Sequence, residues 1–110
     1  MNNLGKAAET RACIYLKLHG YKILERNYTG RFGEIDIIGS KNNEITFFEV
    51  KQRKNDSFGG GAAAVTYSKQ QKIIKTASQY LMQFDKEPAV SFDVIEITGG
   101  RLNHIKNAFY

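Results

Sequence analysis

The sequence predicts an α/β fold in which a mixed central β-sheet is flanked by α-helices, in the element order α-β-β-β-α-β-β. Three observations lead to this prediction. Apolar and polar side chains alternate along residues 33–52 as they do in a β-hairpin. Two segments, 3–19 and 68–84, place apolar residues on one helical face. Residues 90–106 contain two glycines between apolar runs and are typical of a second hairpin.

The composition is that of a folded, basic protein. The chain has 110 residues, of which 42% are hydrophobic, and a single domain spanning residues 1–110 is expected. Sixteen Lys and Arg exceed the 11 Asp and Glu, which favours a polyanionic partner such as nucleic acid. The only cysteine, Cys13, is expected in the core. Neither a membrane-spanning run nor a secretion signal is evident, which predicts no membrane contact and a cytoplasmic location.

The first helix is expected to begin with Asn3 as its N-cap and to end at Gly20, whose position suits a left-handed residue. Glu9 lies at the margin of the apolar face of this helix. From there its carboxylate can lean over the sheet toward the hairpin. The alternative is a solvent-exposed glutamate that pairs with Lys6 or Arg11.

The second helix is expected to begin at a capping box formed by Ser68 and Gln71. Lysines recur every three residues near its start and form a basic ridge. Such a ridge is either an ordinary solvated face or a surface that contacts phosphates. The three successive glycines in residues 53–61 are interpreted as a flexible connection, because the Lys-[Ser/Thr] that closes a phosphate-binding loop is missing. The basic residues concerned are Lys69, Lys72 and Lys75, with Arg53 and Lys54 upstream.

The hairpin at residues 33–52 brings charged side chains together. Residues two apart share a face of a strand, so Asp36 projects from the first strand while Glu49 and Lys51 project together from the second. The charged cluster is expected at the end of the hairpin. The opposite side chains are expected to form one buried layer of Ile35, Ile37, Phe48 and Val50.

Two carboxylates and an ammonium suit the hydrolysis of a phosphodiester with a hard divalent cation, Mg²⁺ or Mn²⁺. Mg²⁺ usually takes one or two carboxylates and completes its shell with waters and substrate phosphates. Asp36 and Glu49 would supply the carboxylates, and the carbonyl of Val50 a further oxygen. Lys51 would orient the attacking water or stabilise the developing anion. The alternative is an exposed ion pair between Glu49 and Lys51, which would add little stability.

Two motifs, GEIDII at residues 33–38 and FEVKQR at residues 48–53, carry a family resemblance that spans nearly the whole chain. The sequence resembles the YraN family of small bacterial proteins, within the PD-(D/E)xK superfamily of restriction-endonuclease-like nucleases, and is similar to archaeal Holliday-junction resolvases. Two positions depart from the relatives' pattern. Ile35-Asp36 replaces the Pro-Asp of the superfamily, and Ser91 stands where relatives often carry arginine.

The resemblance implies the restriction-endonuclease-like fold and an active site made of Asp36, Glu49 and Lys51. It makes Glu9 the first-helix carboxylate that many resolvase-like members add. The expected function is a metal-dependent endonuclease acting on DNA, with branched or single-stranded structures as candidate substrates. The alternative is a non-catalytic nucleic-acid-binding protein that keeps the fold. Junction resolvases act as dimers, so a homodimer is compatible with this function. The expected metal-binding residues are Glu9, Asp36, Glu49 and Val50, and the expected DNA-contacting residues are Arg53, Lys54, Lys69 and Lys72.

Overall fold

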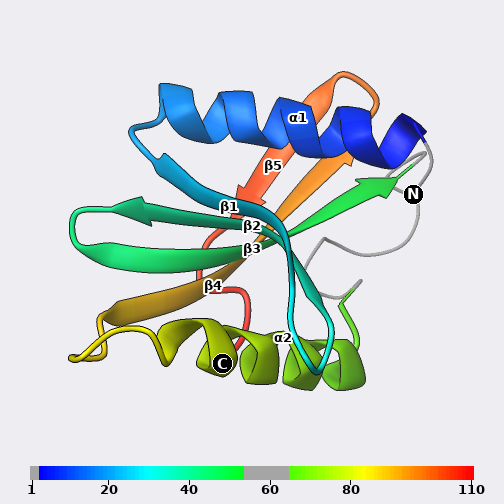
Figure 1. Cartoon of the computed structure of the whole chain (residues 1–110). Helices are drawn as coiled ribbons and strands as arrows, with labels where there is room; N and C mark the ends of the chain where they lie inside the picture. Colours follow the sequence, from blue (N-terminus) through cyan, green and yellow to red (C-terminus); the bar gives the residue numbers. More distant parts are fainter. Residues whose placement is uncertain (1–2, 54–64) are drawn as a thin grey trace.

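The structure is a computed structural model that describes residues 3–53 and 65–110. It has three layers, with helix α1 on one face of a five-stranded sheet and helix α2 on the other (Figure 1). The elements are α1 (Asn3–Leu18), β1 (Lys22–Thr29), β2 (Glu34–Lys41), β3 (Glu44–Arg53), α2 (Tyr67–Leu81), β4 (Ala89–Thr98) and β5 (Arg101–Ile105). The predicted α/β class and element order are confirmed.

The strands lie in sequence order, β1-β2-β3-β4-β5. Strands β3 and β4 are parallel, and every other neighbouring pair is antiparallel. A parallel pair needs a crossover between its strands, and α2 lies in the connection from β3 to β4. The two predicted hairpins therefore become the two sides of one mixed sheet, joined along β3 and β4.

The predicted single buried layer is wrong, because the sheet has an apolar core on each face. Ile37, Phe48 and Val50 pack with α1, whereas Ile35 packs in the other core with Phe47 and α2. Ile35 and Ile37 should share a face by strict alternation. They do not, because β2 separates from β3 beyond Ile37, which is the last β2 residue paired with β3 at this end.

The end of α1 agrees with the sequence prediction, whereas both ends of α2 differ from it. Gly20 follows α1 with a φ of +92°, as predicted, and its N–H donates to the carbonyl of Lys17 at 3.1 Å. The predicted capping box at Ser68 is wrong. Thr66 caps α2 instead, because its backbone is extended and its hydroxyl accepts the N–H of Lys69 at 3.1 Å. Helix α2 ends at Leu81, one turn earlier than expected.

The core beneath α1 and the packing of the C-terminal segment complete the description of the fold. Cys13 is buried in the α1 core, as predicted. The C-terminal segment packs back on the sheet, where the Phe109 ring stacks on Phe92 with centroids 5.4 Å apart. Lys54 and the glycine-rich stretch 55–61 lie outside the described residues. Within residues 3–53 and 65–110, none of the helices is both long and apolar enough to cross a membrane.

Candidate active site

The point where β2 leaves β3 positions Asp36. The backbone pairs between these strands begin at Ile37 with Phe48, so the next residue on each strand, Asp36 and Glu49, is free of that ladder. The Asp36 carboxylate accepts the N–H of Val50 through Oδ2 at 2.8 Å. A side-chain oxygen thus satisfies a strand N–H at the opening, and this bond holds the carboxyl of Asp36 beside that of Glu49.

The carboxyl groups of Asp36 and Glu49 form a coupled pair. Burial raises the pKa of Asp36 to about 8, and the negative charge of Glu49 adds to the effect. The N–H of Val50 opposes the rise, because it favours the ionised form. A hydrogen bond with Glu49 and the more distant charge of Glu9 act in the same direction as burial. Repulsion between two adjacent buried anions therefore favours the protonated form of Asp36 at neutral pH.

Glu9 approaches the pair from α1. Its exposed fraction is 5%, and its Oε1 has no hydrogen-bond partner although the atom is buried. Nη2 of Arg26 lies 3.9 Å from this oxygen, and this distance is near the upper limit for an ion pair. The alternative of an exposed Glu9 paired with Lys6 or Arg11 is wrong, because the guanidinium of Arg11 donates to the carbonyls of the β4–β5 turn.

Asn27 is a residue that the sequence analysis missed. It lies on β1 between the partners of Ile35 and Ile37, at the level of Asp36. Its φ is +52°, a left-handed conformation that asparagine adopts more readily than most residues. Its Oδ1 is buried and has no hydrogen-bond partner. The only signal for it in the sequence was an asparagine within a strand-like run, which is uncommon in sheets.

Two lysines converge on Glu49. Nζ of Lys51 on β3 and Nζ of Lys69 on α2 each lie 3.5 Å from Oε2 of Glu49. The Glu49 side chain is 5% exposed, whereas those of Lys51 and Lys69 are 33% and 45% exposed. The sequence predicted that Lys51 and Glu49 share a face of β3, whereas the contact of Lys69 from α2 was not predicted. Both ammonium groups thus lie between the buried carboxylates and solvent.

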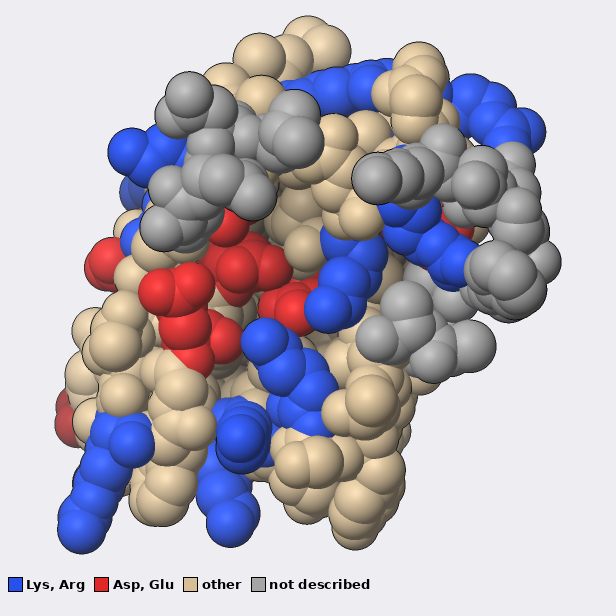
Figure 2. Space-filling model, turned by 90° about the vertical axis from the view of Figure 1, so that its right-hand side faces the viewer, with Lys and Arg blue, Asp and Glu red and all other residues tan. Residues whose placement is uncertain are grey.

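The other residues predicted to contact DNA differ in their surroundings. Arg53 donates to Oε2 of Glu96 at 3.1 Å, so it is engaged within the protein. Lys72 is exposed on α2, one turn beyond Lys69. Figure 2 shows acidic side chains gathered in the middle of the face toward which β3 runs, with lysine and arginine side chains next to them. Acidic and basic side chains thus lie side by side on this face (Figure 2).

The residues present fit a hard divalent cation in donor type. Asp36 and Glu49 offer carboxylate oxygens, and Oε1 of Glu9 and Oδ1 of Asn27 are buried oxygens without a hydrogen-bond partner. Mg²⁺ prefers oxygen ligands and needs only one or two carboxylates from the protein. As the side chains lie, no group of three His, Cys, Asp or Glu among the described residues is arranged to hold a metal ion. Val50 contributes its N–H to Asp36, whereas the prediction assigned its carbonyl to the metal.

The mixed sheet between two helices defines a restriction-endonuclease-like α/β domain. The structure is similar to the crystal structure of a repair endonuclease from Pyrococcus abyssi, with a TM-score of 0.51 and 22% sequence identity. The similar region covers 86% of this chain and 39% of the endonuclease chain, which is less than half of that protein. At this identity the likeness concerns the fold.

The sequence comparisons identify the family. A family model described as "Uncharacterised protein family UPF0102" matches residues 8–97 of this chain. A UPF0102 protein of Thermodesulfovibrio yellowstonii is 49% identical over 107 residues, covering 97% of this chain and 96% of the relative. Those of Persephonella marina and Legionella pneumophila (strain Corby) are 45% and 46% identical, covering 96% of this chain and 91% and 92% of each relative. The chain therefore belongs to the UPF0102, or YraN, family, as the resemblance implied.

Proposed function

We propose that this protein is a single-domain, metal-dependent endonuclease that hydrolyses phosphodiester bonds in DNA, including branched or single-stranded structures. One observation carries the proposal. The opening between β2 and β3 holds Asp36, whose pKa is raised, beside Glu49, and two lysines lie against Glu49. Buried like charges are costly to stability, and such arrangements cluster at functional sites. The nuclease-like fold agrees with the same chemistry.

Each side chain has a role in this proposal. Asp36 and Glu49 would hold Mg²⁺ or Mn²⁺, with Glu9 as a further carboxylate. The bound cation supplies positive charge beside the scissile phosphate and makes the attacking water more acidic. Lys51 would orient that water and stabilise negative charge on the phosphate. The Lys69 side chain, which projects from α2, would leave Glu49 and bind the phosphate. Lys72 would contact the DNA backbone further along the helix.

The first test of this function combines metal binding with cleavage. Calorimetric titration of Mg²⁺ and Mn²⁺ should show binding to the wild type, and Asp36→Asn and Glu49→Gln should each remove it. With either metal, the wild type should cut at least one of a panel of linear, flapped and four-way DNA substrates. Lys51→Ala should slow the cutting at least about a hundredfold, because it removes a group that acts on the water. An uncut panel, or cutting that survives in Asp36→Asn, would contradict the proposal.

A second candidate function is nucleic-acid binding without cleavage. It is favoured because the charged side chains at the site already neutralise one another. Glu49 already contacts two lysines and the carboxyl of Asp36. A protein of this kind would bind DNA equally well in EDTA and in Asp36→Asn. The wild type is instead expected to bind a non-cleavable DNA more tightly when Mg²⁺ is present.

The lysines of α2 provide a separate prediction on DNA affinity. Lys69→Gln and Lys72→Gln should each weaken DNA binding similarly for all sequences and lower the slope of log affinity against log salt by about 1. Fluorescence anisotropy at several salt concentrations measures both quantities. Lys86→Gln is the matched control, because Lys86 is exposed and lies beyond the end of α2. If the control and test variants have the same slope, α2 is not part of the DNA-binding surface.

A further inference from the structure

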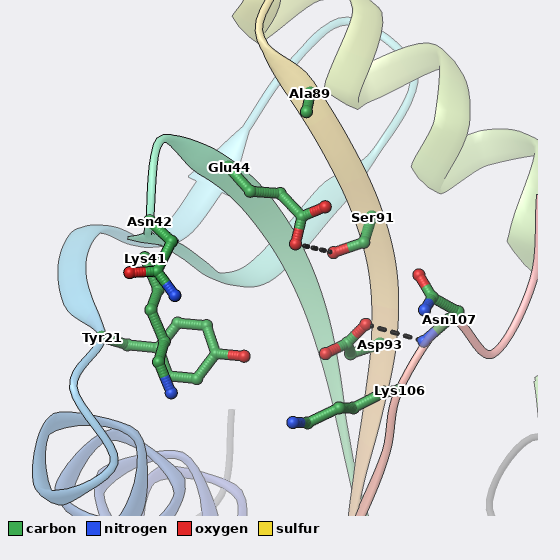
Figure 3. A pocket seen from close by; sticks show the side chains of 9 residues that line it. All are labelled: Tyr21, Lys41, Asn42, Glu44, Ala89, Ser91, Asp93, Lys106 and Asn107. Carbon is green, nitrogen blue, oxygen red and sulfur yellow. Dashed lines mark hydrogen bonds between the residues drawn. The ribbon is translucent and has the colours of Figure 1, made fainter.

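A polar pocket lies at the opposite end of the sheet from the carboxylates of the candidate active site (Figure 3). It opens between the β2–β3 turn and the segment after β5 and has a volume of about 410 Å³ (Figure 3). That volume falls within the range of roughly 300–1,000 Å³ seen for small-molecule sites. Glu44 at this end and Glu49 at the other are separated along β3 by roughly 16 Å, from the rise of a strand. The pocket is therefore separate from the candidate active site.

One end of the pocket is basic. Lys41 and Lys106 both line it, and in the described part of the chain neither ammonium pairs with a carboxylate. Nζ of Lys41 lies 5.1 Å from the ring centroid of Tyr21. In Figure 3 the Tyr21 hydroxyl lies between the Lys41 ammonium group and Asp93, and Lys106 points toward the same space from the segment after β5.

The other end of the pocket offers hydrogen-bond acceptors. Glu44 is exposed, and its Oε1 has only a long contact of 3.5 Å with the Ser91 hydroxyl. Ser91 is buried and is held by Thr46, with the two hydroxyl oxygens 2.8 Å apart. The Glu44 carboxylate therefore retains most of its capacity to accept hydrogen bonds from a ligand.

The wall between the two ends is held rigidly by the protein. Asp93 is 2% exposed, and its Oδ2 lies 2.7 Å from Nε2 of His104. Its Oδ1 accepts the N–H of Asn107 at 3.0 Å, which fixes the turn that follows Lys106. Burial and the charge of Asp93 raise the pKa of Tyr21, so its hydroxyl stays protonated at neutral pH and can donate. Asp93 thus organises the pocket, and its own oxygens are occupied by the protein.

We propose that this pocket binds a phosphorylated sugar, with the phosphate on Lys41 and Lys106 and the sugar hydroxyls on Glu44 and Ser91. Lysine binds phosphate as a point charge, and a carboxylate accepts from hydroxyl groups. A bare anion would meet the negative charge of Glu44, and a cation would meet two ammonium groups. A ligand with an anion at one end and hydroxyl groups at the other satisfies both. This site does not depend on the nuclease function proposed above.

The test is a titration followed by amide NMR shifts at constant ionic strength, with ribose 5-phosphate, inorganic phosphate and ribose as separate probes. Ribose 5-phosphate should bind with a dissociation constant of about 1 mM or tighter. Its affinity should exceed that of each part at least tenfold. The largest shifts should fall on the pocket residues, including Asn42 and Asn107.

Variants separate the two ends of the ligand. Combining Lys41→Gln with Lys106→Gln should weaken both phosphate and ribose 5-phosphate at least tenfold. Glu44→Gln should weaken ribose 5-phosphate severalfold without weakening phosphate. The matched control is Lys17→Gln with Lys86→Gln, which removes two exposed charges elsewhere and should leave affinity unchanged.

Specific outcomes would overturn the proposal. Equal affinity for phosphate and ribose 5-phosphate would show a simple anion site. Binding that survives in the Lys41 and Lys106 double variant, or no binding at millimolar concentration, would show that the pocket is not the site. Asp36→Asn should bind ribose 5-phosphate like the wild type. Failure of the nuclease proposal therefore leaves this result unaffected, and loss of sugar-phosphate binding leaves cleavage unaffected.

Discussion

Asp36→Asn is expected to abolish metal-dependent DNA cleavage, by about 10³-fold or more, while making the folded protein more stable above neutral pH. Asparagine keeps an oxygen that can accept the N–H of Val50, and its amide can donate to Glu49. It therefore resembles Asp36 in its protonated form. The variant loses one of the two carboxylates proposed to hold the divalent cation, and with it the repulsion that this charge causes.

The direction of the pH effect follows from the pKa of Asp36, which burial raises from 3.8 to about 8. Between these values the folded protein binds a proton at Asp36 that the unfolded chain has released. The free energy of unfolding therefore falls as pH rises from 3.8 to about 8, and this contribution is constant at higher pH. Each pKa unit corresponds to about 1.4 kcal/mol, so Asp36→Asn should be more stable than the wild type at pH 9 by about 2 kcal/mol or more.

Urea denaturation across pH 4 to 9 measures this difference, with activity assayed on the same samples. Asp85→Asn is the matched control, because Asp85 is exposed after α2, and it should change neither the pH dependence nor the activity. A wild-type stability curve that is flat or rises over this range would contradict the buried carboxyl pair. A variant that is less stable than the wild type at pH 9 would do the same.

His104→Leu is expected to lower the free energy of unfolding by about 3 kcal/mol, although His104 lies away from the candidate active site. The imidazole bridges two elements, with Nε2 2.7 Å from Oδ2 of Asp93 and Nδ1 3.0 Å from the Tyr15 hydroxyl. The side chains of His104 and Asp93 are only 5% and 3% exposed. Without the imidazole, the buried Asp93 carboxylate loses one partner and keeps the N–H of Asn107 as its hydrogen-bond donor among residues 3–53 and 65–110.

The double variant Asp93→Asn with His104→Leu separates this explanation from simple loss of packing. It should recover part of the stability lost in His104→Leu, because the uncompensated buried charge is gone. The matched control His19→Leu alters an exposed histidine at the end of α1 and should change stability by less than about 1 kcal/mol. If the double variant is no more stable than His104→Leu, packing rather than charge accounts for the loss.

The periodicity of apolar residues was enough to predict the elements and their order. The hairpin carrying Asp36, Glu49 and Lys51, the glycine after α1 and the two-glycine turn before β5 all involve residues close in the chain. Neighbouring backbone groups and their own side chains determine such features. The family resemblance likewise followed from two short motifs within one hairpin, and the comparisons confirmed it.

Other features depend on residues that are distant in sequence. Ile35 and Ile37 lie in different cores because β2 separates from β3, which alternation along a strand does not encode. Lys69 meets Glu49 only because α2 covers that face of the sheet.

The residue types at the candidate site could be selected from the sequence, because carboxylates and lysines at strand spacing already specify the chemistry available. Their protonation could not, because the pKa of Asp36 depends on burial between strands and on the approach of Glu49. The same holds for the buried oxygens of Glu9 and Asn27 that lack a hydrogen-bond partner, and for the pocket lined by Lys41 and Lys106. Burial and long-range charge exist only after α1 and α2 have packed on the sheet, so these properties belong to the folded chain.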